Sequence, residues 1–291
     1  MNKSVNTLKI LEDAWLNLDR DSSNIVNPFA VETEEEFHVK LTWLLANPEY
    51  FSFICKHIFN VEILPSQALF LQEMWYRKFP MLIASRGFGK SFILSLYSML
   101  RALLMPGRKI VIVGAAFRQS KVLFEYMDTI WRNAPLLRDI AGGNSGPRKD
   151  VDMCRMIIGD STVTCLPLGD GSKIRGQRAN DIVADEFASI PRAIFENVVA
   201  GFAAVSASPI ENVKRIAAEK QAKSKGIELE DTRDEMTKRG NQIILSGTAY
   251  YDFNHFAEYW KKWKQIISSK GDKKKLGEVF GEDGVPNDFD W

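Results

Sequence analysis

The sequence predicts an α/β fold in which helices cover both faces of a mostly parallel central sheet. Between residues 81 and 250, short β-rich apolar runs alternate with segments of helical periodicity. This alternation is typical of parallel sheets whose strands are joined by helices. The expected strands are 81–84, 109–114, 156–159, 162–166, 182–184 and 242–245, and the expected helices are 91–104, 120–133 and 193–204.

Segments outside this alternation have other patterns. Residues 1–60 have a helical pattern and carry no phosphate or metal motif. Strands 156–159 and 162–166 are separated by two polar residues, which favours an antiparallel hairpin added to the sheet. The glycine-rich segment 143–147 predicts a loop.

Length and composition are those of an ordinary globular chain. The 291 residues include 38 Lys and Arg against 37 Asp and Glu, and 45% are apolar. These values exclude wholesale disorder, collagen-like repeats and a disulfide-rich mini-protein. The three cysteines are widely spaced, and the three histidines fit no zinc spacing. No membrane association is expected, because no apolar run is long enough to span a bilayer. Since the net charge is +1, any contact with nucleic acid must come from local patches.

The strongest local signal is at residues 81–91, where an apolar strand enters a glycine-containing loop that ends in Lys90 and Ser91. Gly87 and Gly89 allow backbone N–H groups to point inward around a polyphosphate. The start of the following helix adds the positive end of its dipole. The Lys90 ammonium is expected on the β- and γ-phosphates and the Ser91 hydroxyl on Mg²⁺. The alternative is a glycine-rich turn before a core helix.

One position departs from the usual pattern G-x-x-x-x-G-K-[ST]. Where this pattern begins with glycine, the chain has Ala84. Alanine can serve at this position if its φ angle is negative. We therefore expect a negative φ angle at Ala84.

A second motif, residues 181–186, is an apolar strand that ends in two carboxylates. Asp185 follows the strand at its carboxyl end, where ligands bind in open α/β sheets. We expect Asp185 to ligate Mg²⁺ directly or through water, and Glu186 to orient or deprotonate the attacking water. Two exposed acids at a strand end are the alternative. Together with the phosphate loop, the pair predicts hydrolysis of ATP.

A third candidate is the strand segment 242–249, which ends in Ser246, Gly247 and Thr248. Hydroxyls at the carboxyl edge of a strand can sense a γ-phosphate and pass its loss to a moving element. An ordinary strand followed by a turn is the alternative.

These motifs, in this order, resemble the N-terminal ATPase domain of the large terminase subunit of tailed phages, a family that packages double-stranded DNA into empty capsids. Segment 85–91 is similar to the family's variant phosphate loop, which contains an arginine and often lacks the first glycine. Segment 61–67 resembles its adenine-recognition stretch, which implies that Gln67 reads adenine. Segments 172–178 and 246–249 resemble its R-G element and its coupling motif.

The resemblance implies a role for each site residue. Arg86, inside the loop, would stabilise the transition state in cis, whereas Arg175 or Arg178 would act in trans from a neighbouring subunit. A surface pair near a loop is the alternative for Arg175 and Arg178. The residues implied to bind ATP are Gln67, Ser85, Arg86, Gly87, Phe88, Gly89, Lys90, Ser91 and Phe92, those implied to hold Mg²⁺ are Ser91 and Asp185, and the coupling residues are Ser246, Gly247 and Thr248.

The resemblance spans roughly residues 45–262 and implies a P-loop NTPase of the ASCE type with a small helical lid subdomain. Residues 1–60 would form the N-terminal part of the lid, 61–254 the ATPase core, and 255–291 the rest of the lid and a linker toward an absent nuclease domain. We therefore expect no nuclease activity in this chain. The implied partners are double-stranded DNA, the portal protein of the procapsid, the small terminase subunit and further copies in a ring, pentameric when docked. A monomer in solution is the alternative, and the implied location is the host cell cytoplasm.

Two other functions stay open from the residues alone. A superfamily-2-like helicase core would share these motifs, but it needs a second similar core domain. A nucleotide-gated assembly module without turnover would have no need of Glu186. The seven lysines within residues 261–275 form either a DNA-facing patch or a solvated helix end.

Overall fold

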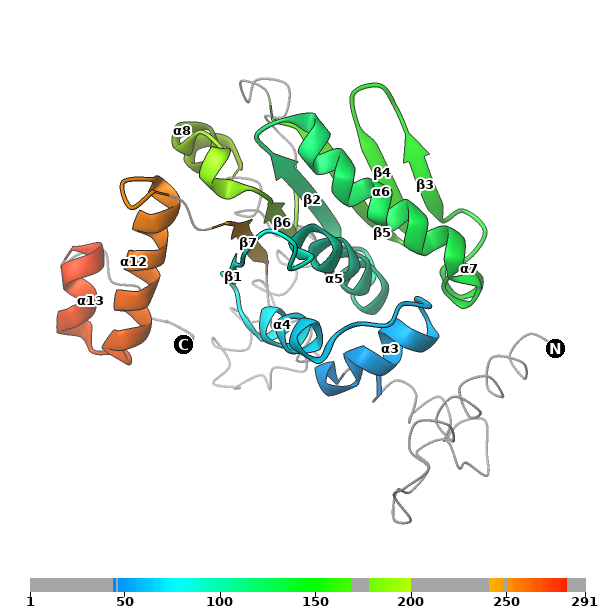
Figure 1. Ribbon diagram of the computed structural model, residues 1–291, viewed down its shortest axis with the longest axis horizontal. Helices are drawn as coiled ribbons and strands as arrows, with labels where there is room; N and C mark the ends of the chain where they lie inside the picture. The colour runs from blue at the N-terminus through cyan, green and yellow to red at the C-terminus, as the bar shows by residue number, and fades with distance from the viewer. Residues whose placement is uncertain (1–43, 46, 169–177, 200–240, 249–250, 282–291) are drawn as a thin grey trace, which may run out of the picture.

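The computed structural model describes residues 44–45, 47–168, 178–199, 241–248 and 251–281. They form a seven-stranded sheet with helices against it (Figure 1). The strands are β1 (Met81–Ile83), β2 (Lys109–Gly114), β3 (Gly146–Lys149), β4 (Cys154–Ile158), β5 (Ser161–Pro167), β6 (Asp181–Ala184) and β7 (Gln242–Gly247). The helices are α3 (Phe51–His57), α4 (Pro65–Tyr76), α5 (Lys90–Leu104), α6 (Phe117–Asn133), α7 (Pro135–Ala141), α8 (Arg192–Ile194), α12 (His255–Ser269) and α13 (Lys273–Phe280).

The strands lie in the order β1-β7-β6-β2-β5-β4-β3. The first five are parallel, whereas β4 and β3 are antiparallel to their neighbours. The predicted fold class, a mostly parallel sheet flanked by helices, is therefore confirmed, as is the antiparallel hairpin of β4 and β5. Strand β7, late in the chain, lies between β1 and β6.

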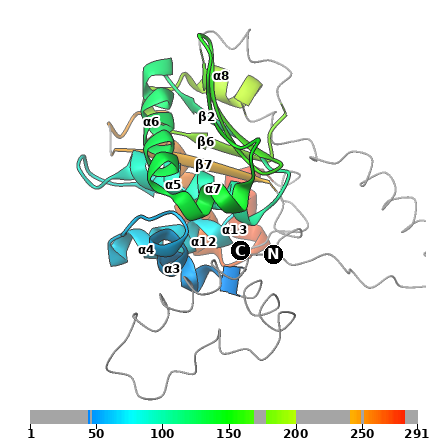
Figure 2. The ribbon, with the colours of Figure 1, turned by 90° about the vertical axis from the view of Figure 1, so that its right-hand side faces the viewer.

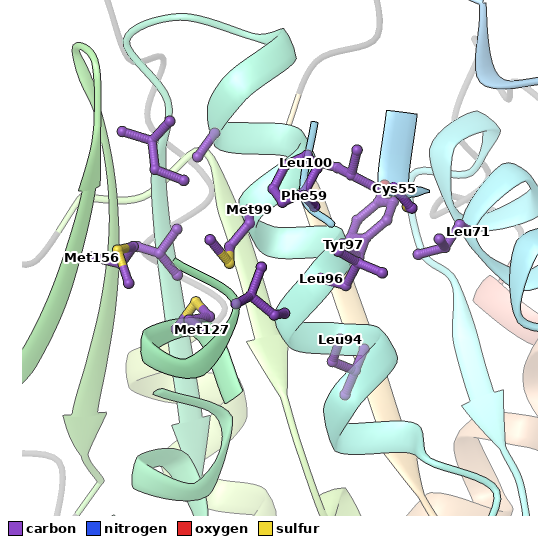
Figure 3. Close-up of a cluster of buried hydrophobic side chains, with 14 of the residues drawn as sticks. Cys55, Phe59, Leu71, Leu94, Leu96, Tyr97, Met99, Leu100, Met127 and Met156 are labelled. Atoms are coloured by element: carbon purple, nitrogen blue, oxygen red, sulfur yellow. The ribbon is translucent and has the colours of Figure 1, made fainter. Parts of the chain in front are cut away.

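Side chains of alternate residues along β2 enter two separate cores, as a pleated strand requires. Ile110 and Ile112 join the larger core, beneath α5 and α6. Figure 3 shows part of it, with Met99 of α5 and Met127 of α6 facing Met156 of the sheet. On the opposite face Val111 and Val113 pack in the smaller core, and Figure 2 shows α6 and α8 on opposite sides of the strands.

Residues before the first strand contribute to the larger core. Leu44, Phe51 and Phe59 are almost completely buried in the same cluster as α5. The predicted division of the chain at residue 60 stays a prediction, because these side chains share the core of the sheet. The described residues include no helix that is long and apolar enough to span a bilayer.

One local prediction was wrong. The predicted loop 143–147 overlaps β3, which begins at Gly146 and pairs with β4. This edge strand is polar and contains Pro147, so it lacks the apolar pattern of a strand, although proline is tolerated at sheet edges. The predicted helix 193–204 is helical where the structure describes it, as the short α-helix α8 followed by the π-helix η4 (Phe195–Val199), and its remainder is outside the described residues.

A buried ion pair joins α5 to the amino end of β6. Arg101 donates from Nη2 to Oδ1 of Asp181 at 2.8 Å and from Nε to Oδ2 at 3.2 Å, and both side chains are 1% exposed. The Arg101 guanidinium also lies 5.1 Å from the ring centre of Trp75. Asp181 accepts a further hydrogen bond from the backbone N–H of Gln242, the first residue of β7. One carboxylate thus fixes α5, β6 and β7 together.

We predict that Asp181→Asn lowers the free energy of unfolding by about 3–5 kcal/mol, since it leaves the buried Arg101 charge without its counter-charge. Urea unfolding followed by circular dichroism measures this value. The matched control Asp160→Asn, in the exposed β4–β5 turn, should change it by less than about 0.5 kcal/mol. Equal stability of the two variants would show that the ion pair is not needed.

Candidate functional site

The loop between β1 and α5 has the backbone that a phosphate-binding loop requires. Gly87 and Gly89 both have φ of +86°, in the left-handed region that favours glycine. Gly89 is the residue before α5, so the helix begins at Lys90. Ala84 is not among the described residues with positive φ, so alanine at this position is compatible with the loop.

Lys90 is held inside this loop. Only 7% of the residue is exposed, and its ammonium donates to the backbone oxygens of Ala84 at 3.2 Å and Ser85 at 3.4 Å. A third hydrogen bond, of 3.1 Å, goes to the hydroxyl of Thr248, after β7. An ammonium has three donors, so an incoming phosphate oxygen has to replace one of these partners. The phosphate loop and the predicted coupling motif are thus in direct contact.

Ser91 and Asp185 also meet, although they are far apart in the sequence. The Ser91 hydroxyl donates to Oδ2 of Asp185 at 3.1 Å. Asp185 is 2% exposed, and its other oxygen, Oδ1, is buried without a hydrogen-bond partner in the described part of the chain. Burial raises the pKa of this carboxyl, and the hydrogen bond from Ser91 opposes the rise.

This pair fits a magnesium ion. Mg²⁺ prefers oxygen ligands and is usually bound by one or two protein side chains, water and substrate phosphates rather than by a complete protein cage. Ser91 Oγ and the unpartnered Asp185 Oδ1 supply that number. Within the described residues no group of three or more His, Cys, Asp and Glu side chains is placed to hold a metal.

Glu186, the next residue, has a strained backbone. Its φ of 49° and ψ of 47° lie in the left-handed region, which costs a non-glycine residue about 1–3 kcal/mol. The neighbouring residues hold Glu186 in this conformation. The backbone N–H of Asp185 donates a hydrogen bond to the backbone oxygen of Val113, and the Phe187 side chain is completely buried. Such strain is common at active sites. The left-handed backbone turns the half-buried Glu186 away from the direction of β6.

The predicted coupling residues lie at the carboxyl end of β7, beside the acidic motif. Ser246 and Gly247 are the last two residues of the strand, and Thr248 follows it. The pairing of Ala184 with Leu245 places Asp185 next to Ser246, whose hydroxyl is buried without a partner in the described residues. Gly247 faces Phe256 of α12, because a Cβ atom on this glycine would lie 2.9 Å from the phenyl ring. The absence of a side chain at Gly247 therefore lets α12 approach the site.

Gln67 and α4 lie against the phosphate loop. Gln67 Nε2 is 3.3 Å from the place where a side chain on Gly89 would begin, and Gln67 Oε1 accepts from the N–H of Leu64. Phe88 of the loop packs edge-on against Phe70 of α4, with ring centres 5.1 Å apart. The position of Gln67 is compatible with the predicted contact to adenine.

The other predicted site residues are less closely grouped. Phe92, in the first turn of α5, packs against Tyr126 of α6. Ser85 and Arg86 are exposed in the phosphate loop. Arg178 precedes the amino end of β6, whereas the site lies at the carboxyl end, about 13 Å further along the strand. Arg178 is thus remote from the phosphate loop of its own chain, and Arg175 is outside the described residues.

Sequence reasoning missed the contacts that hold these motifs together. Phe70 supports the loop, and Tyr97 of α5 donates to Gln242 of β7 at 2.8 Å while Gln242 donates to the backbone of Met74 in α4 at 2.9 Å. These residues belong to segments far apart in the chain, so no local pattern could indicate them.

Residues 81–208 match the family described as terminase large subunit, T4likevirus-type, N-terminal. This segment is therefore similar to the N-terminal region of terminase large subunits. It contains the phosphate loop and the acidic motif, and the resemblance inferred from the motifs is confirmed. No curated protein matches the chain.

Solved structures of phage large terminases are similar to this chain. The large terminase of bacteriophage HK97 has a TM-score of 0.50 and 13% identity over 78% of this chain, which spans 41% of the HK97 protein. The large terminase of a thermophilic bacteriophage in complex with ADP scores 0.46 with 12% identity, over 74% of this chain and 50% of its own. A Thermus phage large terminase ATPase domain has a TM-score of 0.38 and 11% identity, over 79% of this chain and 97% of that domain. The HK97 comparison supports the fold, and this chain covers less than half of that protein.

We predict that Gly247→Ala lowers the free energy of unfolding by about 1–3 kcal/mol, because the new methyl group overlaps the buried Phe256 ring. Thermal and urea unfolding measure the loss. Gly143→Ala is the control, since a Cβ atom there meets no other atom within 4 Å. If Gly247→Ala is as stable as the control, the close contact between α12 and β7 is wrong.

Proposed function

We propose that this chain is an ATP-hydrolysing motor domain of a terminase large subunit and that it drives double-stranded DNA into a procapsid. The observation that carries the proposal is the hydrogen bond between Ser91 and Asp185, with Lys90 and Glu186 adjacent. It unites a phosphate loop with an acidic pair, the combination that phosphoryl transfer requires. The terminase family of residues 81–208 supports the cellular role.

In the proposed reaction, the loop N–H groups and Lys90 bind the β- and γ-phosphates of ATP. Lys90 exchanges its bond to Thr248 for a phosphate oxygen, so binding of ATP releases the strand end that follows β7. Ser91 and Asp185 would hold Mg²⁺, and the ion would supply positive charge beside the phosphate oxygens. Glu186 accepts a proton from the attacking water, and Arg86 stabilises the transferring phosphoryl group from within the loop.

The partners follow from this role and are proposals as well. They are double-stranded DNA, the portal protein of the procapsid, the small terminase subunit and further copies of this chain in a ring. Arg178, remote from its own phosphate loop, supports catalysis across a subunit interface, together with or in place of Arg175. Such a motor acts in the host cell cytoplasm during assembly of the virion.

We predict that Lys90→Ala abolishes productive ATP binding, whereas Glu186→Gln binds ATP with near-normal affinity and hydrolyses it about 10²–10⁴-fold more slowly. Titration with a fluorescent ATP analogue and a phosphate-release assay separate the two effects. Glu125→Gln, on the exposed face of α6, is the control and should behave as wild type. Equal loss of binding in the Lys90 and Glu186 variants would refute these roles.

A second prediction concerns assembly. If an arginine acts in trans, the ATPase rate per subunit rises with protein concentration and rises further with double-stranded DNA, and Glu186→Gln removes both rates. Steady-state turnover over a dilution series measures this. A rate that is independent of concentration would contradict catalysis between subunits, and ATP that stays intact with Mg²⁺ and DNA would indicate a binding module instead of a motor.

A further inference from the structure

The hairpin of α12 and α13 concentrates positive charge in a chain whose net charge is only +1. Its residues 255–280 include seven lysines and three acidic residues. The lysines are all exposed: Lys261, Lys262, Lys264, Lys270, Lys273, Lys274 and Lys275. Among the described residues, Asp252 is the single ion-pair partner of this set, 2.7 Å from Lys261. The hairpin thus presents charge that its own fold leaves largely uncompensated.

Three of the lysines lie where their positive charge destabilises their own helix. Lys273, Lys274 and Lys275 are the first three residues of α13, after the cap residue Asp272. Backbone N–H groups give a helix N-terminus a positive partial charge, so cations there are unfavourable. A local rule broken without a structural gain indicates a functional constraint.

The base of α12 is fixed to the catalytic motif. A His255 ring nitrogen lies 3.1 Å from the backbone oxygen of Phe187, the residue after Glu186, and the Phe256 and Phe187 rings are 5.6 Å apart. Glu258 accepts from Arg192 at 2.8 Å. In Figure 1, α12 extends from this contact and α13 packs along its outer side. A displacement of the segment 186–187 or of the end of β7 therefore moves the lysines.

We propose that the exposed lysines of α12 and α13 bind the phosphate backbone of double-stranded DNA. This inference rests on the proposed function and names the surface that contacts the DNA. Duplex DNA carries a regular row of phosphate charges, which lysines can neutralise without reading the sequence. The attachment of α12 to the acidic motif favours DNA over an anionic membrane, because a translocase must connect its ATP site to the polymer that it moves.

The test compares wild type with the triple variant Lys273→Gln, Lys274→Gln, Lys275→Gln. Binding of a short fluorescent DNA duplex is followed by anisotropy over a salt series. The slope of log affinity against log salt should become shallower by about 0.9 for each lysine that contacts a phosphate, or about 2.7 for all three. The melting temperature should stay the same or rise, because the substitutions relieve the helix terminus. If the triple variant is as stable as wild type but binds DNA more weakly, the loss of binding is not caused by misfolding.

The matched control removes three exposed lysines elsewhere: Lys56→Gln, Lys109→Gln, Lys121→Gln. Its salt slope should equal that of wild type. A triple variant of α13 that binds DNA as tightly as wild type, a wild type that does not bind DNA, or tighter binding of wild type to phosphatidylserine vesicles would each overturn the inference. ATP turnover without DNA is measured in parallel and reports on the proposed function alone, since these lysines are outside the ATP site.

Discussion

Strand β7 lies between β1 and β6, and the geometry of the site depends on this order. Parallel strands end at the same edge of a sheet, so the residues that follow these three strands become neighbours. Lys90 follows β1, Thr248 follows β7 and Asp185 follows β6. The hydrogen bonds from Lys90 to Thr248 and from Ser91 to Asp185 connect the segments at these strand ends. A phosphate that replaces Thr248 as a partner of Lys90 therefore releases the end of the strand between the loop and the acidic motif.

Helix α5 is fixed to β6 at both ends. Ser91 bonds to Asp185 near the start of the helix, and Arg101 bonds to Asp181 ten residues later. Ten helical residues span about 15 Å and four strand residues about 13 Å, so the two pairs of contacts are compatible only if helix and strand lie side by side. A buried ion pair is a weak source of net stability, but here it fixes the helix that begins at the phosphate loop.

The sequence predicts the parts of this site better than their connections. Strand 109–114, helix 91–104 and both carboxylates were found because periodicity and local motifs determine them. The edge strand at Gly146 was missed because its residues are polar and include Pro147, so they lack the apolar alternation of a strand. The support of Phe88 by Phe70, and the clamp of Gln242 on Tyr97 and Met74, depend on tertiary packing, so no local pattern indicates them. The left-handed backbone of Glu186 is likewise imposed by the burial of its neighbours.

Three unfavourable local features of the described residues are connected to one another. Asp185 buries an oxygen without a partner in the described residues, Glu186 has a strained backbone, and α13 begins with three lysines. Phe187 and α12 join the first two to the third. A chain selected for stability alone would remove each feature with one to three substitutions. Their connection through packed aromatic side chains is more consistent with one constraint, which relates the state of the nucleotide to the position of a charged surface.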